Sequence, residues 1–157
     1  MAKGWHIIIF ASAIFCLSGC VSTRLSRTQK IDRVIGTARS YTGTPYLYGG
    51  MSRSGIDCSG LLYMSFKSAG ITLPRTAQLQ SKTGKRVSID ELRPGDLVFF
   101  SAKKGKRKIT HAGLVTTRKG NTLIQFIHSS TSRGVIEANL LNDYYKSIFV
   151  KARRPGY

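Results

Sequence analysis

The first half of the chain carries apolar residues at the spacing of amphipathic helices. From Lys30 to Tyr41 they recur every three or four residues, so they share one face of a predicted helix with Thr28 as a possible cap. These residues are Ile31, Val34, Ile35 and Ala38. A second helix is predicted from Cys58 to Ala69, with Asp57 as its N-cap and Gly70 at its end. Its inward-facing residues are Leu61, Leu62 and Phe66. We expect residues 43–56, rich in glycine, to be a loop, and residues 74–81 could form a short helix.

After Pro94 and Gly95 the pattern changes from helix to strand. Short runs of β-branched and aromatic residues follow one another, each bounded by turn residues. These runs are residues 96–101, 111–117, 122–129, 134–138 and 147–154. The segment 119–121 reads as a hairpin turn between two of them. Helices followed by an antiparallel sheet predict an α+β domain, and 157 residues provide a core for one such domain.

The first twenty residues have the layout of a secretory signal. Lys3 supplies a positive charge, and residues 7–15 form an apolar run too short for the roughly 20 residues of a membrane span. The segment LSGC at 17–20 resembles the lipobox of bacterial lipoproteins, which implies lipidation of Cys20 and removal of residues 1–19. Plain secretion and an uncleaved anchor are the alternatives. Residues 20–29 would then be a lipidated tether and residues 30–157 the folded domain. Val21 stands where an aspartate would indicate inner-membrane retention, so we expect an outer-membrane anchor facing the periplasm.

Charge and cysteine usage sharpen this picture. The formal net charge of +18 indicates an anionic partner such as nucleic acid, a membrane surface or an acidic polymer. Export argues against nucleic acid. Of the three cysteines, Cys16 would leave with the signal and Cys20 would carry lipid, so Cys58 is the one thiol left in a compartment that favours disulfides. A leftover cysteine in an exported protein indicates a reactive thiol.

Cys58 and two histidines are candidates for chemistry. At a helix start, unpaired amides and the helix dipole favour a thiolate and can lower a cysteine pKa from about 8.5 to roughly 3.5–7.5. His111 opens one predicted strand and His128 lies near the end of the next, so pairing would bring them to the same end of the hairpin. A cysteine, a histidine and a polar group that orients it suffice for thiol-based acyl transfer. The alternatives are an inert core cysteine with half-buried histidines, or a zinc site, for which close-spaced ligand pairs are missing.

Four segments together resemble the NlpC/P60 family of cell-wall peptidases: PYLYGG (45–50), GIDCSGLLY (55–63), RPGDLVFF (93–100) and THAGLV (110–115). They occur in the family's order and spacing, and the resemblance extends from about Ile31 to Arg154. It implies a papain-like fold, in which N-terminal helices, one of them carrying the nucleophile, pack on an antiparallel sheet that carries the histidine.

The resemblance also implies roles for individual residues. Cys58 would be the nucleophile and His111 its general base and later acid, with His128 orienting the imidazole. Tyr46 would join the backbone N–H of Cys58 in stabilising the oxyanion. Asp57 and Ser59 would line the substrate site, although Asp57 could equally be only a helix cap. Because the connection between the histidines looks longer than usual, Ser129 or Ser130 could take the place of His128.

The implied reaction is hydrolysis of amide bonds next to diaminopimelate in peptidoglycan peptides, with neither metal nor organic cofactor. Alternatives are acyl transfer or amidase action on the same fold, or a non-catalytic lipoprotein that binds anionic polymer through its charge. We expect a monomer whose partners are peptidoglycan peptides and, through lipid on Cys20, a membrane. A basic loop precedes His111 and is either simply solvated or steers the carboxylates of stem peptides toward the cleft. Its cations are Lys103, Lys104, Lys106, Arg107 and Lys108.

Overall fold

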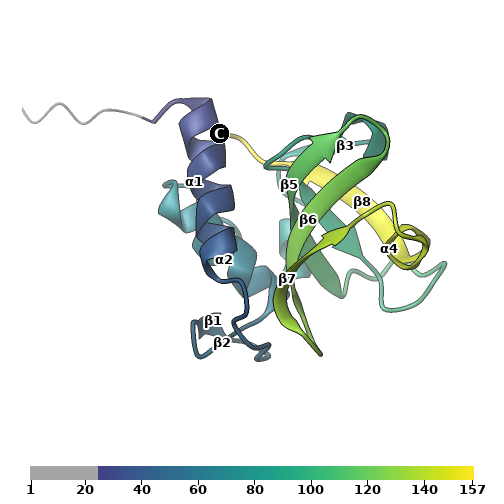
Figure 1. The fold of residues 1–157 in the computed structure, drawn as a ribbon, viewed down its shortest axis with the longest axis horizontal. Helices are drawn as coiled ribbons and strands as arrows, with labels where there is room; N and C mark the ends of the chain where they lie inside the picture. The colour runs from purple at the N-terminus through teal and green to yellow at the C-terminus, as the bar shows by residue number, and fades with distance from the viewer. Residues whose placement is uncertain (1–24) are drawn as a thin grey trace, which may run out of the picture.

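The computed structural model describes residues 25–157. The predicted signal, the lipobox and Cys20 lie outside these residues. Helices α1 (Arg27–Ser40) and α2 (Cys58–Ser68) form one layer, and a six-stranded antiparallel sheet forms the other (Figure 1). The predicted α+β architecture is therefore confirmed. Within residues 25–157, no helix has the length and apolar character needed to cross a membrane.

The first helix begins earlier than its apolar spacing indicated. Ser26, not Thr28, is its N-cap, because Gln29 stands three residues later and its side chain bonds back to the Ser26 amide in a capping box. Thr28 lies inside the first turn, so residues 27–29, expected in the tether, belong to α1. The face predicted to be apolar is the buried one, with Val34 and Ala38 fully covered.

The second helix follows its prediction closely. Asp57 caps it through the amide of Gly60, and Gly70 follows its end with a φ of 73°, a left-handed conformation that suits glycine. The short helix α3 (Ala77–Gln80) lies inside the predicted segment. The loop at 43–56 contains a small hairpin, β1 (Met51–Ser52) with β2 (Gly55–Ile56), which glycine content alone did not indicate.

The large sheet has the strand order β3-β8-β4-β5-β6-β7. All five predicted strands are present: β4 (Leu97–Phe100), β5 (His111–Lys119), β6 (Leu123–Ser130), β7 (Gly134–Asn139) and β8 (Phe149–Arg154). The edge strand β3 (Lys85–Val87), the 3₁₀ turn Ile89–Glu91 and the helix α4 (Asp143–Ile148) were not predicted. Residues 147–148, expected to open the last strand, complete α4 instead. The strand β3 has three residues, two of them cations, and so lacks the alternation of apolar and polar residues that predicts a strand. It is recognised only by its pairing with β8.

The sheet is covered on both faces, and β4 is buried at every position. Leu97 and Phe99 face the helices and join the helix-side cluster, which contains the apolar faces of α1 and α2. Val98 and Phe100 face the opposite way and join the outer cluster. This outer cluster also contains Val115, Ile124, Phe126, Leu140 and Ala152, with Tyr145 and Phe149 packed against it. The site described next forms where the two layers meet.

Candidate active site

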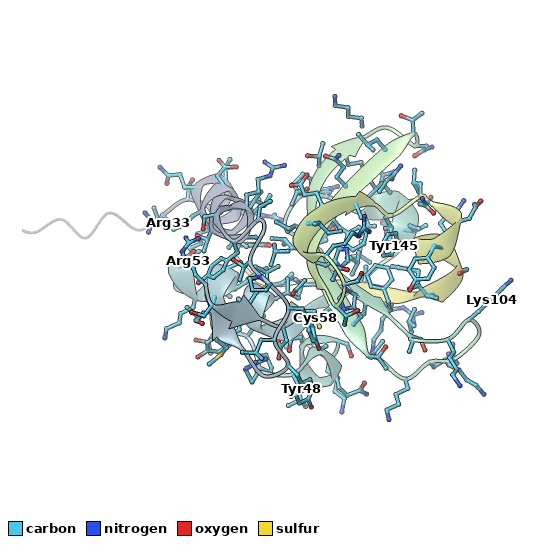
Figure 2. All side chains as sticks on the ribbon, turned by 60° about the horizontal axis from the view of Figure 1, so that its bottom comes forward. Arg33, Tyr48, Arg53, Cys58, Lys104 and Tyr145 are labelled. Atoms are coloured by element: carbon cyan, nitrogen blue, oxygen red, sulfur yellow. The ribbon has the colours of Figure 1, made fainter. Side chains whose placement is uncertain are left out.

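Cys58 is the first residue of α2 and lies between the helical layer and the sheet (Figure 2). Its exposed fraction is 8%, and it is the one free cysteine within residues 25–157. The helix can begin this close to the preceding loop only because residue 60 is glycine: a Cβ there would overlap the carbonyl oxygen of Gly50. α2 packs against β5 and β6, so Cys58 is brought to the end of the sheet where β5 begins.

Asp57 is the centre of a polar network beneath Cys58. Its carboxylate accepts hydrogen bonds from the Gly60 amide at 2.6 Å, the Ser59 hydroxyl at 3.0 Å and the Gly49 amide at 2.9 Å. Arg75 donates to both carboxylate oxygens, at 2.9 and 2.8 Å. Burial raises the pKa of Asp57, but the hydrogen bonds from Arg75, Gly60 and Ser59 outweigh it and hold this pKa below its usual value. Asp57 is thus more than a cap, because it ties α2 to the loop at 49 and to Arg75.

The two histidines meet at one end of the β5–β6 hairpin, as their positions in the strands predicted. His111 Nε2 lies 2.8 Å from His128 Nδ1. Ser129, one of the alternatives to His128, donates its hydroxyl to the Ile56 carbonyl, and Ser130 lies 3.5 Å from the hydroxyl of Ser132. The structure therefore places His128, and neither serine, against His111.

Aromatic side chains enclose the histidine pair. The ring of His128 stacks on Phe126 at a centroid distance of 5.0 Å and an interplanar angle of 22°. The ring of His111 lies 6.0 Å from that of Phe100. On its far side, His128 Nε2 lies 3.1 Å from the Tyr145 hydroxyl, which α4 supplies. Phe100 and Phe126, which contact the imidazoles, belong to the outer cluster.

Burial sets the protonation of all three groups. Desolvation lowers the pKa of His111 to about 4 and that of His128 to about 3. For Cys58, burial raises the pKa to about 11, although the amides of Ala112, Ser59 and Cys58 itself act in the opposite direction. The expectation of a lowered thiol pKa at the helix start is wrong here, because desolvation of the thiolate exceeds the stabilisation by these amides. In the resting protein Cys58 is therefore a neutral thiol and His111 a neutral imidazole.

Two adjoining pockets, of about 400 and 530 Å³, flank Cys58 and share Tyr46 and Thr110. The smaller is lined by the other predicted substrate residues, Asp57 and Ser59, together with Arg75. The larger is lined by His111 and His128, with Arg133 and Tyr145. Burial, followed by the charges of Cys58 and Asp57, raises the pKa of Tyr46, so its phenol keeps its proton and can donate a hydrogen bond.

Within residues 25–157 no group of three histidine, cysteine or acidic side chains has the arrangement of a metal site. The facing nitrogens of His111 and His128 already bond to each other, which is not the arrangement of ligands around a shared zinc ion.

Sequence reasoning missed two residues that contact the predicted ones. Arg75 follows Pro74 in a segment expected to be a short helix, and no local pattern connects it to Asp57, 18 positions earlier. Tyr145 lies in α4, a six-residue helix without a buried residue, so no apolar periodicity marks it. Only the tertiary structure brings each to its partner.

Comparison with known proteins gives a consistent result. The sequence model described as "NlpC/P60 family" matches residues 43–154. The chain is 43% identical over 117 residues to "Probable endopeptidase NlpC" of Escherichia coli, which is 74% of this chain and 72% of that one. It is 39% identical over 124 residues to "Murein DD-endopeptidase MepS/Murein LD-carboxypeptidase" of Escherichia coli, 78% of this chain and 62% of that one. A crystal structure of an NlpC/P60 family protein from Bacillus cereus superposes with a TM-score of 0.71 at 34% identity, covering 79% of this chain and 39% of that one. From the residues matched and the identity to these relatives, it follows that the chain belongs to the NlpC/P60 family.

Proposed function

We propose that the chain is a cysteine-type endopeptidase that hydrolyses amide bonds in peptidoglycan stem peptides, with Cys58 as nucleophile and His111 as base. One observation carries the assignment of residues: His111, bonded to His128 at 2.8 Å, lines a pocket together with Cys58. Family membership and the relative named as a murein endopeptidase support the substrate class.

The neutral resting pair determines how the reaction begins. Because burial disfavours both thiolate and imidazolium, His111 takes the thiol proton as the sulfur attacks the carbonyl carbon, rather than before substrate arrives. His111 Nε2 is engaged with His128, so Nδ1 is the nitrogen left to exchange this proton. The imidazolium then protonates the leaving amine, and the C–N bond breaks to leave a thioester on Cys58. Water, deprotonated by His111, hydrolyses the thioester and restores the thiol.

The developing oxyanion needs two donors that are in place before the reaction. The backbone N–H of Cys58 is one of the unpaired amides at the start of α2, and the protonated Tyr46 phenol lies in both pockets beside it. Loss of one such donor typically costs about 10²–10³ in kcat.

Proton transfer also orients the substrate in the groove. The leaving amine must reach His111, so the larger pocket, which contains His111, receives the amine half of the substrate and the smaller pocket receives the acyl half. Arg133 is the one charged residue among the described residues that line the larger pocket. A cation there suits an amine half with a free carboxylate, as diaminopimelate has, in either the D-Ala–diaminopimelate or the γ-D-Glu–diaminopimelate bond.

We further propose that lipid on Cys20 anchors the enzyme to the outer membrane, facing the periplasm. The lipobox-like segment at 17–20 supports this, and the two Escherichia coli relatives fit an envelope location. Radiolabelled palmitate should enter the wild-type protein and not a Cys20→Ala variant. Equal incorporation into both would contradict the anchor.

The test of the function is digestion of purified muropeptides by the wild-type enzyme and by Cys58→Ala, with products identified by mass spectrometry. New amine and carboxyl ends should appear with the wild type alone, and their masses identify the bond. Equal cleavage by both proteins would exclude Cys58 as nucleophile. Cleavage by neither would favour a binding protein or a different substrate.

A further inference from the structure

A line of polar groups extends from the histidine pair away from Cys58. His111 Nε2 lies 2.8 Å from His128 Nδ1, and His128 Nε2 lies 3.1 Å from the Tyr145 hydroxyl. No other hydrogen bond involves either ring within residues 25–157. Each of the two contacts needs one donor and one acceptor, so the direction of one determines the direction of the other.

Only one direction supports catalysis. If His111 Nδ1 is to accept the thiol proton, neutral His111 must carry its hydrogen on Nε2 and donate it to His128 Nδ1. His128 must then carry its own hydrogen on Nε2 and donate it to the Tyr145 oxygen. In the reverse direction Tyr145 donates to His128, His128 donates to His111, and His111 is left with its hydrogen on Nδ1, where it cannot take a proton from Cys58.

We propose that Tyr145 is a positioning residue, which accepts the hydrogen bond of His128 Nε2–H and thereby holds both imidazoles in the tautomers that the reaction needs. The inference rests on the proposed roles of Cys58 and His111 and adds a fourth group to them. It concerns the hydroxyl alone, because the Tyr145 ring has a separate role in packing.

The surroundings of Tyr145 support a fixed acceptor. Its ring meets Phe126 edge to face at 4.9 Å and lies 5.8 Å from Phe100, so two buried aromatic residues hold the hydroxyl in place. Arg133 disfavours protonation of His128, whose pKa is lowered first by burial and then by the charges of His111 and Arg133. With His128 kept neutral, each imidazole carries one hydrogen, and a Tyr145 oxygen that accepts from His128 places both hydrogens on Nε2.

The chain offers a matched pair of variants. Tyr145→Phe removes the hydroxyl and keeps the ring, whereas Tyr63→Phe makes the same change on a half-buried tyrosine of α2 that lines neither pocket beside Cys58 and for which the structure shows no side-chain hydrogen bond. Without its acceptor, His128 Nε2–H would be an unpaired buried donor, and the reverse tautomers would become more populated. We expect kcat on muropeptides to fall about tenfold in Tyr145→Phe with KM within about twofold, and to stay within about twofold of wild type in Tyr63→Phe.

A substrate-free readout separates this inference from the function itself. Two-dimensional ¹H–¹⁵N NMR of histidine-labelled protein reports which nitrogen of each ring carries hydrogen. Nε2–H on both His111 and His128 in the wild type, with Nδ1–H rising at both in Tyr145→Phe, supports the proposal even if muropeptides are not the substrate. Nδ1–H at His128 in the wild type, or tautomers unchanged by Tyr145→Phe, would overturn it.

A double-mutant comparison shows whether Tyr145 acts through His128. In a His128→Ala background, Tyr145→Phe should cause no further loss of kcat beyond about twofold. An equal tenfold loss in both backgrounds, accompanied by an equal fall in Tm, would assign Tyr145 a purely structural role and refute the proposal.

Discussion

The nucleophile and its base are held in place by two different kinds of structure. Cys58 begins a helix whose start is fixed by charged and polar contacts, above all the bidentate pair of Asp57 with Arg75. His111 and His128 are enclosed by the aromatic side chains of the outer cluster and bond to one another. The helix-side half of the site is polar and depends on the ion pair of Asp57 with Arg75. The sheet-side half is apolar and keeps both imidazoles neutral.

The difference follows from what each half must do. The oxyanion requires amides that point at a fixed position, and a charge-assisted network of short hydrogen bonds fixes a helix start well. A general base must be unprotonated at working pH, and burial among aromatic rings ensures this by lowering the pKa of both histidines. Each half can therefore be disturbed by a change that leaves the other intact.

Acid should disturb the sheet-side half first, and with the largest effect. An ordinary histidine has a pKa of about 6.5 when unfolded, whereas His111 and His128 have folded values of about 4 and 3. The unfolded state therefore binds more protons as pH falls through this window. The stability that the two histidines contribute is fully present above pH 6.5 and is lost progressively as pH falls toward 3. Each pKa unit by which folding lowers the value of a histidine corresponds to about 1.4 kcal/mol of unfolding free energy, and both histidines contribute.

Urea unfolding between pH 4.5 and 7.5 measures this loss. Over this range carboxyl groups contribute little, because their ordinary pKa values lie near 4. A His111→Gln/His128→Gln variant should show a flatter dependence on pH. The same slope in the variant and the wild type would mean that other groups cause the acid sensitivity.

Removal of the Asp57 carboxylate should disturb the helix-side half. Asp57→Ala deletes the cap of α2 and leaves the half-buried Arg75 without its anion. We therefore expect the free energy of unfolding to fall by about 3 kcal/mol. Displacement of the Cys58 amide should lower kcat at least about 10²-fold. Thermal unfolding and muropeptide kinetics measure the two effects.

The matched control removes the cation as well. Asp57→Ala combined with Arg75→Met has no unpaired charge, so it should regain part of the lost stability while kcat stays low. If the double variant is no more stable than the single one, the ion pair contributes nothing to this half beyond the helix cap.

Two buried phenylalanines allow a finer test of the comparison. Phe66 belongs to the helix-side cluster and Phe126 to the outer cluster, and both are fully buried. Replacing either by Leu should cost roughly 1–2 kcal/mol of stability. Phe126→Leu should also lower kcat about tenfold, because the ring stacks on His128, whereas Phe66→Leu should leave kcat within about twofold. Equal kcat values at equal stability would show that packing on His128 does not position the base.

The two halves also differ in how far the sequence predicts them. Asp57 as a cap and the helix-side residues Leu61, Leu62 and Phe66 follow from spacing alone, because helix periodicity and capping are local. Pairing through the turn at 119–121 predicts that His111 and His128 share one end of the hairpin, whereas their contact also requires the register shift between Val115 and Thr117. These signals act over a few residues or a single turn, so they can be recognised without knowledge of the fold.

Contacts that depend on tertiary structure were not predictable in this way. The Arg75 guanidinium reaches Asp57 across a loop, and Tyr145 reaches His128 from a helix with no buried face. The pKa of Cys58 was predicted in the wrong direction, since the helix start is visible in the sequence and the desolvation around the thiol is not. All three depend on how the two layers pack, which local sequence patterns do not report.

The smallest expected effect lies outside both halves, in the loop with Lys103, Lys104, Lys106, Arg107 and Lys108. Figure 2 shows Lys104 at the outer end of this loop, away from Cys58, so its charge acts on substrate only through solvent. Replacing the five cations by Ser should lower kcat/KM about threefold at 10 mM salt and leave it unchanged at 0.5 M salt, where the screening length is a few ångströms. A control with the same loss of charge replaces Lys82, Lys85, Arg86, Arg93 and Lys119, none of which lines either pocket beside Cys58. An equal loss in both variants would assign steering to net charge, and an unchanged salt dependence in the loop variant would leave the loop as a solvated connection between β4 and β5.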